Sequence, residues 1–431
     1  MRSSPPPTPE DDGLEGSLPG AVPSEAMTER TMADVAIVGA GPAGAAAAIT
    51  LARAGRSVVL LDKASFPRDK ICGDGITTGA LRLLEELGVR PASVPSWTAV
   101  SDIHVVSPSQ HIATFPLPRE RGQFAAVMRR TDLDAAIVDQ ARAEGAEVLE
   151  GAEVTAATDG RDAVELQLAD GRTVQADQVI AADGMWSPMR KLLGTAVPGY
   201  LGEWHAFRQY FRNVGPQAKD LWVWFEPDLL PGYAWCFPLP DGGANVGFGI
   251  QRGAKIATKE MKALWPELLG RPHIAAVLGP NAEPEDRHQA WPIPARAGDL
   301  ALTAGRVLWV GDAAAVTDPM TGEGIGQALL TGQLAGQAIL LGQGDPAKVR
   351  AHYQHAVAKN LVPDHKMSML LIRALKHRRG AQAAIRAADL NPWTRRNFAR
   401  WLFEDEPRAI AVTPGRWHRR VLRRDGAFVE S

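Results

Sequence analysis

Three glycines near the start of the chain have the spacing that a phosphate-binding turn requires. Gly39, Gly41 and Gly44 follow the short apolar segment 34–38 and precede an alanine-rich segment typical of a helix. Gly39 would permit a tight turn, Gly41 would let a pyrophosphate approach the backbone, and Gly44 would let helix and strand pack closely. The helix N-terminus would then offer free N–H groups and the positive end of its dipole to the phosphates.

A carboxylate stands where a ribose would need one. Asp62 ends the next apolar segment, 58–61, about twenty residues beyond the glycines, where such a group accepts hydrogen bonds from ribose hydroxyls. Strand, glycine turn, helix and strand follow one another within about thirty residues, which makes a weak motif specific. The sequence therefore predicts a Rossmann-like dinucleotide-binding unit.

One of the two cysteines lies in a setting that suggests chemistry. A lone cysteine is most often a small buried hydrophobic residue. Cys72, however, lies between Lys70 and Gly73 in a glycine-rich segment, and a nearby cation such as Lys70 would lower its pKa and favour the thiolate. Cys236 lies far away and no CxxC pair occurs, which excludes a disulfide scaffold or a cysteine zinc site and fits a reducing cytosol.

Further candidates follow predicted strands. Asp183 and Gly184 come after the apolar segment 179–182, and Asp183 can equally be turn chemistry. Asp312 ends the strand 307–310, where open α/β sheets hold ligands, and it could also cap the turn 313–315. Gly322 and Gly324 open a predicted helix, 324–341, whose first N–H groups would be free to face a ligand.

The middle third of the chain indicates a second sheet. The runs 205–213, 221–225, 233–237 and 245–250 alternate with Pro and Gly turns, which predicts an antiparallel meander. Tyr233, Trp235 and Phe237 would share one strand face. That face either packs into its own core or forms a wall for an apolar ligand. Elsewhere the patterns predict helices at 81–87 and 133–143, the latter capped by Thr131 or Asp132, and a hairpin around Asp170.

Four motifs stand in the order of a known superfamily. The segments 39–44, 183–184, 311–312 and 319–324 together resemble the FAD-dependent enzymes of the aromatic-hydroxylase superfamily. The segments 70–75, Lys-Ile-Cys-Gly-Asp-Gly, and 233–238, Tyr-Ala-Trp-Cys-Phe-Pro, are similar to signatures of the geranylgeranyl reductase family, which includes bacterial menaquinone reductases. The resemblance extends from about Ala33 to Leu341, and the C-terminal part matches only loosely.

The resemblance implies FAD as cofactor and roles for particular residues. Asp312 would bond the ribityl chain of FAD, and the start of the helix at Gly324 would face the flavin pyrimidine edge. Catalytic candidates are Cys72, Lys70 and Gly73, and Tyr233, Trp235 and Phe237 would form an apolar substrate wall. The expected FAD contacts are Gly39, Gly41, Ala43, Gly44, Asp62, Lys63, Arg130, Val154, Asp183, Gly311, Asp312, Pro319, Gly322, Gly324 and Ile325.

Length and composition suit two intimately joined domains. The chain has 431 residues, 45% hydrophobic and 22% charged, and its net charge of −2 gives no reason to expect a nucleic-acid partner. We predict an α/β fold: a Rossmann-like FAD-binding domain with an inserted antiparallel β-sheet substrate domain and a helical C-terminal region. The expected boundaries are a disordered tail at 1–31, an FAD-binding domain at 33–100, 120–195 and 296–345, a substrate domain at 101–119 and 196–295, and the helical region at 346–431.

The resemblance favours a reductase that saturates carbon–carbon double bonds of a polyprenyl chain, such as a prenyl diphosphate, a prenylated lipid or a quinone. No second dinucleotide fingerprint occurs, so NAD(P)H or another reductant would be a transient electron donor. The alternative is a flavin-dependent monooxygenase or halogenase acting on an apolar or aromatic molecule. Trp222 and Trp224 superficially resemble a halogenase signature, but Glu226 replaces its apolar residue. A non-catalytic flavin or lipid-binding protein at a membrane is the third possibility.

The C-terminal region is rich in tryptophan and arginine, which suits a boundary between lipid headgroups and acyl chains. We interpret it as a peripheral contact with the inner face of the membrane by a cytoplasmic protein without a spanning segment. Alternatively, the tryptophans pack the helices onto the FAD domain, and 404–406, Glu-Asp-Glu, interrupts the basic run. The residues concerned are Trp393, Phe398, Trp401, Phe403 and Trp417, with Arg395, Arg396, Arg400, Arg408, Arg416, Arg419, Arg420, Arg423 and Arg424.

Overall fold

The computed structural model describes residues 1, 30–403, 406–417 and 424–429. The predicted tail, 1–31, lies almost entirely outside these residues. Its last two residues were assigned wrongly, because strand β1 (Arg30–Val38) begins at Arg30 and pairs with Thr173. The alignment with a neighbouring strand, rather than the local composition, sets this start.

The first sheet is mainly parallel and has the strand order β18-β19-β11-β1-β2-β8. β1 lies between β11 and β2 and is parallel to both, as the glycine motif predicts. The predicted hairpin around Asp170 is present, and its second strand continues without a break through the segment expected to be a separate strand. The bounds are β2 (Val58–Leu61), β8 (Glu147–Leu149), β9 (Val154–Asp159), β10 (Val164–Leu168), β11 (Thr173–Ala181), β18 (Thr303–Ala304) and β19 (Val307–Trp309).

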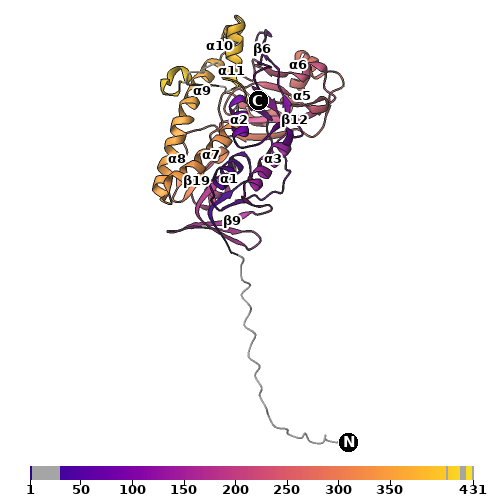
Figure 1. Cartoon of the computed structure of the whole chain (residues 1–431). Helices are drawn as coiled ribbons and strands as arrows, with labels where there is room; N and C mark the ends of the chain where they lie inside the picture. Colours follow the sequence, from indigo (N-terminus) through magenta and orange to yellow (C-terminus); the bar gives the residue numbers. More distant parts are fainter. Residues whose placement is uncertain (2–29, 404–405, 418–423, 430–431) are drawn as a thin grey trace.

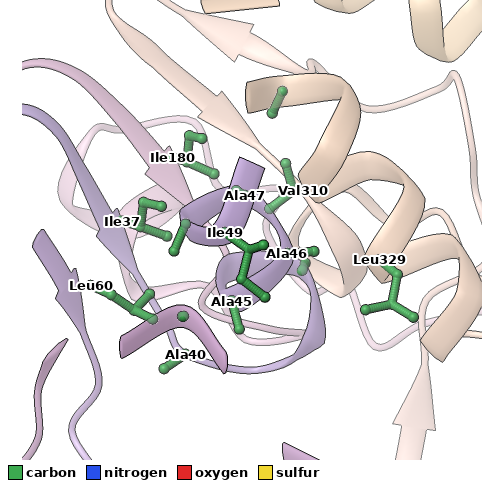
Figure 2. Close-up of a cluster of buried hydrophobic side chains, with 14 of the residues drawn as sticks. Ile37, Ala40, Ala45, Ala46, Ala47, Ile49, Leu60, Ile180, Val310 and Leu329 are labelled. Atoms are coloured by element: carbon green, nitrogen blue, oxygen red, sulfur yellow. The ribbon is translucent and has the colours of Figure 1, made fainter. Parts of the chain in front are cut away.

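Small side chains let one helix lie at the centre of this domain. Helix α1 (Pro42–Arg53) is buried over nearly its whole length, between the sheet and helix α7 (Ile325–Gly342). Figure 2 shows its alanines between Ile37 on the sheet and Leu329 on α7. A Cβ on Gly332 of α7 would overlap the backbone of Ala43, so the two helices approach closely because neither carries bulk at the contact.

The second sheet has the order β16-β12-β15-β14-β13-β5-β6, with β17 also paired to β12. Only β13, β14 and β15 form the predicted meander. β12 pairs with β15, and β13 is parallel to β5, so the sheet is mixed rather than purely antiparallel. The bounds are β5 (Asp102–Val106), β6 (Ile112–Pro116), β12 (Trp204–Arg212), β13 (Leu221–Trp224), β14 (Ala234–Leu239), β15 (Gly243–Gln251), β16 (Glu283–Pro284) and β17 (Gln289–Ile293).

A short third sheet has the order β3-β7-β4. Its strands are β3 (Gly75–Thr77), β4 (Thr98–Ala99) and β7 (Ala125–Val127). β3 follows the Cys72 segment directly and pairs with β7, so this sheet fixes the position of that segment. Strands from 101–119 lie in the second sheet together with those from 196–295, and the division into domains remains a prediction.

The helical C-terminal region is present. Figure 1 shows α10 and α11 at the end of the molecule opposite the β9 hairpin. Among the described residues, none of the helices has the length and apolar character needed to cross a membrane. The other helices are α2 (Thr78–Glu86), α3 (Arg130–Ala143), α4 (Pro188–Leu192), α5 (Met261–Leu269), α6 (Pro272–Leu278), α8 (Pro346–Asn360), α9 (Val362–Leu375), α10 (Arg378–Ala388) and α11 (Pro392–Leu402).

The predicted cap of α3 was wrong. The helix begins at Arg130, and its N-cap is Arg129, without a side-chain cap among the described residues. The Asp132 carboxylate instead accepts a hydrogen bond from the backbone of Ser96 at 3.0 Å. The sequence-based cap failed because a partner distant in sequence takes up this carboxylate.

Candidate active site

One cavity of about 670 Å³ gathers nearly all of the predicted site residues. Residues from both large sheets, from the Cys72 segment and from helices α9, α10 and α11 line it. Every candidate catalytic, cofactor and wall residue lines this cavity except Gly44, which packs beneath the glycine turn. Segments that lie far apart in the sequence thus meet at one place, although each residue's role remains a proposal.

The glycine turn has the geometry that a pyrophosphate needs. Gly39 has a φ of 102°, and a Cβ there would clash with the backbone of Ala182. A Cβ on Gly44 would overlap the carbonyl of Gly39. Around Gly41, by contrast, the nearest atom to an added Cβ is an Arg68 nitrogen 3.6 Å away, so the backbone there borders open cavity. Gly41 is also the N-cap of α1, where no described side chain takes up the free N–H groups. The turn therefore fits the phosphates of FAD.

Asp62 lines the cavity and also stabilises the glycine turn through hydrogen bonds. Its two carboxylate oxygens accept hydrogen bonds from the backbone N–H groups of Ala40 and Ala64, each at 2.8 Å. Each oxygen keeps a second lone pair, which can accept from a ribose hydroxyl. Asp183 is engaged more locally, because its carboxylate accepts from Ser187 Oγ and from the backbone of Met189, both at 2.7 Å.

The loop 318–324 leads into α7 and is organised by a carboxylate that sequence reasoning missed. Asp318 Oδ1 accepts from the backbone of Met320 at 3.0 Å and from the backbone and hydroxyl of Thr321, both at 2.9 Å. Its Oδ2 accepts from Ser368 Oγ of α9 and from Arg408 Nε. The C-terminal segments therefore hold the loop that contains the motif 319–324.

Two sequence expectations at this end of the cavity need correction. Asp312 does not cap the turn 313–315, because no described side chain caps it, and the carboxylate instead accepts from Thr317 Oγ1 at 3.3 Å. The backbone N–H groups in the first turn of α7 are not all available to a ligand either, because the Gly326 N–H donates to Glu323 Oε1 at 2.6 Å. Burial raises the pKa of Glu323 to about 7.

The environment of Cys72 differs from the predicted one. Burial raises the pKa of its thiol, so the thiolate is not favoured. Arg130 is the main cation that opposes this effect, and it makes a bidentate pair with Asp134 at 2.7 Å. Burial lowers the pKa of Lys70 to about 8, and its ammonium lies 3.5 Å from the centre of the Trp291 ring. The predicted thiolate was therefore wrong.

The aromatic wall lies directly across from the Cys72 segment. The ring centres of Tyr233 and Trp235 are 6.1 Å apart, and those of Trp235 and Phe237 are 6.0 Å apart. A Cβ on Gly73 would lie 3.7 Å from the rings of both Trp235 and Phe237. At the other end of the wall, the Tyr233 hydroxyl donates to the Thr321 carbonyl. The wall thus spans the distance from the loop 318–324 to Cys72.

Sequence reasoning also missed a polar cluster beneath this wall. The Asp74 carboxyl accepts hydrogen bonds from Tyr210 Oη at 2.7 Å and from Asn245 Nδ2 at 2.8 Å. All three side chains are buried. Asp74 lies inside the family motif, and its position next to Cys72 was the available signal. Tyr210 and Asn245 had none, because the pattern treated them as ordinary strand residues.

The predicted membrane-contact residues divide into two groups. Phe398, Trp401 and Phe403 line the cavity, whereas Trp393 and Trp417 are each 62% exposed. Several arginines serve the structure: Arg400 and Arg408 are buried, Arg395 pairs with Asp389, and Arg416 pairs with Asp364. Residues 404, 405, 419, 420 and 423 lie outside the described part of the chain.

Comparison with known proteins agrees with this geometry. Residues 32–333 match the family model described as an FAD binding domain. The menaquinone reductase of Mycolicibacterium smegmatis is 36% identical over 330 residues, which cover 70% of this chain and 75% of that protein. Digeranylgeranylglycerophospholipid reductase 1 of Methanopyrus kandleri is 34% identical over 308 residues, which cover 69% of this chain and 78% of that one.

Solved structures share the fold. The crystal structure of a geranylgeranyl bacteriochlorophyll reductase-like protein from Thermoplasma acidophilum has a TM-score of 0.75 and 19% identity, and the match covers 90% of this chain and all of that one. A halogenase crystallised with FAD has a TM-score of 0.66 and 17% identity, over 88% of this chain and 85% of that one.

The fold and the glycine cradle define an FAD-dependent oxidoreductase. Within this class, the chain belongs to the FAD-binding family that includes the menaquinone and digeranylgeranylglycerophospholipid reductases.

Proposed function

We propose that the protein uses FAD to saturate carbon–carbon double bonds of a polyprenyl chain carried by a quinone, a lipid or a diphosphate. The observation that carries this proposal is the single cavity, in which the FAD cradle, the Cys72 segment and the aromatic wall face one another. When bound, reduced FAD supplies a hydride. The protein must then hold an uncharged alkene against it, exclude water and supply a proton.

Apolar side chains extend the cavity beyond the wall into the C-terminal helices. Leu371 and Leu375 of α9, Ile385 of α10 and Phe398 and Trp401 of α11 all line it. A polyprenyl chain is long and lacks hydrogen-bonding groups, so only apolar surface can bind it favourably. This extension supports a prenyl substrate over a small aromatic one.

The residues of the Cys72 segment would act at the reacting bond. Gly73 leaves room between the segment and the wall, where a larger residue would approach Trp235 and Phe237. Cys72 and Lys70 line the same part of the cavity. Cys72 would limit the space around the double bond, and the Lys70 amine would place a polar group near it. The FAD contacts would be those named from the sequence, with Asp62 near the ribose and Asp312 near the ribityl chain.

The same fold occurs in a halogenase, so fold alone does not separate reduction from oxygen-dependent chemistry. The Cys72 segment, the wall and the reductase names of the relatives favour reduction. NAD(P)H or another reductant would reduce the flavin transiently.

Exposed apolar side chains near the same helices support a peripheral membrane contact at the cytoplasmic face. Leu370 of α9, Leu390, Trp393, Val412 and Trp417 are all more than half exposed. Ala374 of α9 and Ala384 of α10 line the cavity and are exposed as well, which favours an opening between these helices. A prenyl chain dissolved in the bilayer would then have a short path to the wall.

Mass spectrometry of the lipid product tests the function. Incubation of the FAD-loaded protein with a reductant and a prenyl diphosphate or a prenylated lipid without a quinone ring should add two hydrogens for each reduced double bond. A control with Gly41→Val, which we expect not to hold FAD, should leave the substrate mass unchanged. A product that gains oxygen or halogen instead of hydrogen would contradict the proposal.

A further inference from the structure

A buried carboxyl group follows the thiol of Cys72 by two residues and borders the same cavity as the aromatic wall. Asp74 lines the cavity and is fully buried. Its neighbours Gly73 and Gly75 both face the wall, and a Cβ on Gly75 would lie 3.0 Å from the Phe237 ring. The backbone of Asp74 has a φ of 64°, an unfavourable value for a residue with a side chain, so the surrounding structure must hold it there.

Both donors that reach this carboxyl bind the same oxygen. Tyr210 Oη and Asn245 Nδ2 donate to Oδ2, whereas Oδ1 is enclosed and has no hydrogen-bond partner among the described residues. An ionised carboxylate with a buried, unpaired oxygen is unfavourable. A neutral carboxyl that accepts on Oδ2 and carries its proton on Oδ1 avoids leaving an ionised oxygen buried without a partner. Burial accordingly raises the pKa of Asp74 to about 6, although the bonds from Tyr210 and Asn245 lower it.

The neighbours hold the carboxyl in place and can stabilise its charged form. Trp235 Nε1 donates to Asn245 Oδ1 at 3.0 Å, which turns the amide N–H groups toward Asp74 and the Cys72 carbonyl. The guanidinium groups of Arg208 and Arg129 lie 4.0 Å and 4.4 Å from the Tyr210 ring centre. The titratable and charged groups around Asp74 are thus Cys72, Arg129, Arg130, Arg208 and Tyr210.

We propose that Asp74 is the acid that supplies the proton when the double bond is reduced, a role that rests on the proposed function. The π electrons of the double bond form a C–H bond with the proton of Asp74 Oδ1 at one carbon, while the hydride from reduced FAD completes a C–H bond at the other. FAD is left oxidised and Asp74 ionised. Tyr210, Asn245 and the nearby arginines stabilise this carboxylate until a proton from water restores it.

Cys72 has a different part in this arrangement. Its Sγ accepts a hydrogen bond from the Asp74 N–H at 3.4 Å, and its carbonyl accepts from Asn245. Because burial raises the pKa of this thiol above its ordinary value, Cys72 is a weaker acid than Asp74. Cys72 is therefore a positioning residue for the carboxyl, and removing it should impair proton donation indirectly.

The first test follows the half-reaction that consumes the proton. Asp74→Asn preserves the shape of the side chain but removes the acid. FAD reduced with dithionite, without excess reductant and under anaerobic conditions, is mixed with a prenyl diphosphate or a prenylated lipid that has no quinone ring to take up the electrons, and flavin reoxidation is followed by absorbance. We expect Asp74→Asn to slow reoxidation by roughly 100-fold or more while FAD binding stays the same. Asp102→Asn, whose carboxylate pairs with Arg119 at the surface of the second sheet, should match the wild type.

The second test uses Tyr210→Phe and reads the protonation of the carboxyl. Loss of the Tyr210 hydrogen bond should raise the pKa of Asp74 and move the alkaline limb of the reoxidation rate to higher pH. Infrared difference spectra of the FAD-bound protein between acidic and alkaline pH should show the carbonyl band of a protonated carboxyl. The pH at which this band is half lost should be higher in Tyr210→Phe than in the wild type, and the band should be absent in Asp74→Asn. A carboxyl with a purely structural role would not move the limb of the rate profile.

The outcomes separate the two proposals. Wild-type protein that is not reoxidised by any prenylated substrate would overturn the proposed function. Wild-type reoxidation together with an Asp74→Asn rate within threefold would overturn only the role of Asp74. Should Asp74→Asn fail to fold, an unmoved alkaline limb in Tyr210→Phe would overturn that role instead.

Discussion

Arg408 Nε lies 3.2 Å from Asp318 Oδ2, and both side chains are buried. This pair joins the C-terminal segment to the loop that leads into α7 and borders the cavity. The same carboxylate also orders Thr321, whose carbonyl accepts from the Tyr233 hydroxyl. Hydrogen bonds therefore connect the loop 318–324, the aromatic wall and the C-terminal segment.

We predict that Arg408→Ala weakens both folding and FAD binding. Removal of the arginine leaves a buried carboxylate without its charge partner, which costs about 3 kcal/mol of stability. Thermal melting and FAD titration by fluorescence measure the two effects. The matched control is Arg395→Ala, which removes a partly exposed pair with Asp389 and should cost less than about 1 kcal/mol. Equal effects of the two variants would contradict this account.

Gly41→Val should abolish FAD binding without unfolding the protein. The added side chain would enter the space that the pyrophosphate must occupy, whereas its nearest neighbour among the described residues, an Arg68 nitrogen, is 3.6 Å from the added Cβ. The wild type should be yellow and release FAD on heating, and the variant should be colourless with an unchanged far-UV spectrum. Gly415→Val, at a position with open space around it, is the control that should stay yellow. A colourless wild type that ignores added FAD would refute the assignment of the cofactor.

The two cysteines should differ in their effect on turnover. Cys72→Ala and Cys72→Ser should retain FAD but lose most reductase turnover, because Cys72 borders the cavity and contacts Asp74. Cys236 is fully buried in the second sheet, so Cys236→Ala should cost a little stability and leave turnover nearly unchanged. Equal turnover of all three variants on a prenyl diphosphate would remove Cys72 from the mechanism.

The raised pKa of Asp74 predicts a pH dependence of stability. Burial raises this pKa from 3.8 to about 6, so the folded state binds the proton more tightly than the unfolded state does. Stability is therefore lost as pH rises between about 4 and about 6, by up to about 3 kcal/mol from this group. Asp74→Asn removes this loss, so the stability of the variant relative to the wild type should increase through that window. Urea unfolding at pH 4, 5, 6 and 7 measures it, and a constant difference would show that the carboxyl does not titrate there.

Membrane contact should depend on exposed tryptophans and on anionic lipid. Co-sedimentation with anionic vesicles should exceed that with neutral vesicles and fall at high salt. The double variant Trp393→Ser and Trp417→Ser should bind less with an unchanged melting temperature, because both side chains are exposed. Met32→Ser, an exposed apolar residue on β1, is the control. Lack of binding to either vesicle at any salt concentration would leave these residues without a membrane role.

The sequence by itself determined the features that depend on local backbone geometry. The glycine turn at 39–44 was predictable because each glycine answers a steric requirement set within a few residues of it. The apolar strands β1, β2 and β19, the C-terminal part of β11 and the long helix α7 were predictable from the runs and spacing of their apolar residues. The residues of segments 70–75 and 233–238 carried the family resemblance and with it the expected cofactor.

The tertiary structure decided the contacts between distant segments. Asp74, Tyr210 and Asn245 form one cluster only because β12 pairs with β15 rather than with β13, a register that no local pattern specifies. The α3 cap was mispredicted because a distant backbone group, that of Ser96, binds Asp132. Composition also could not show which C-terminal tryptophans line the cavity and which face outward. Packing of α9 to α11 against the two sheets decides that, because burial depends on which surfaces meet.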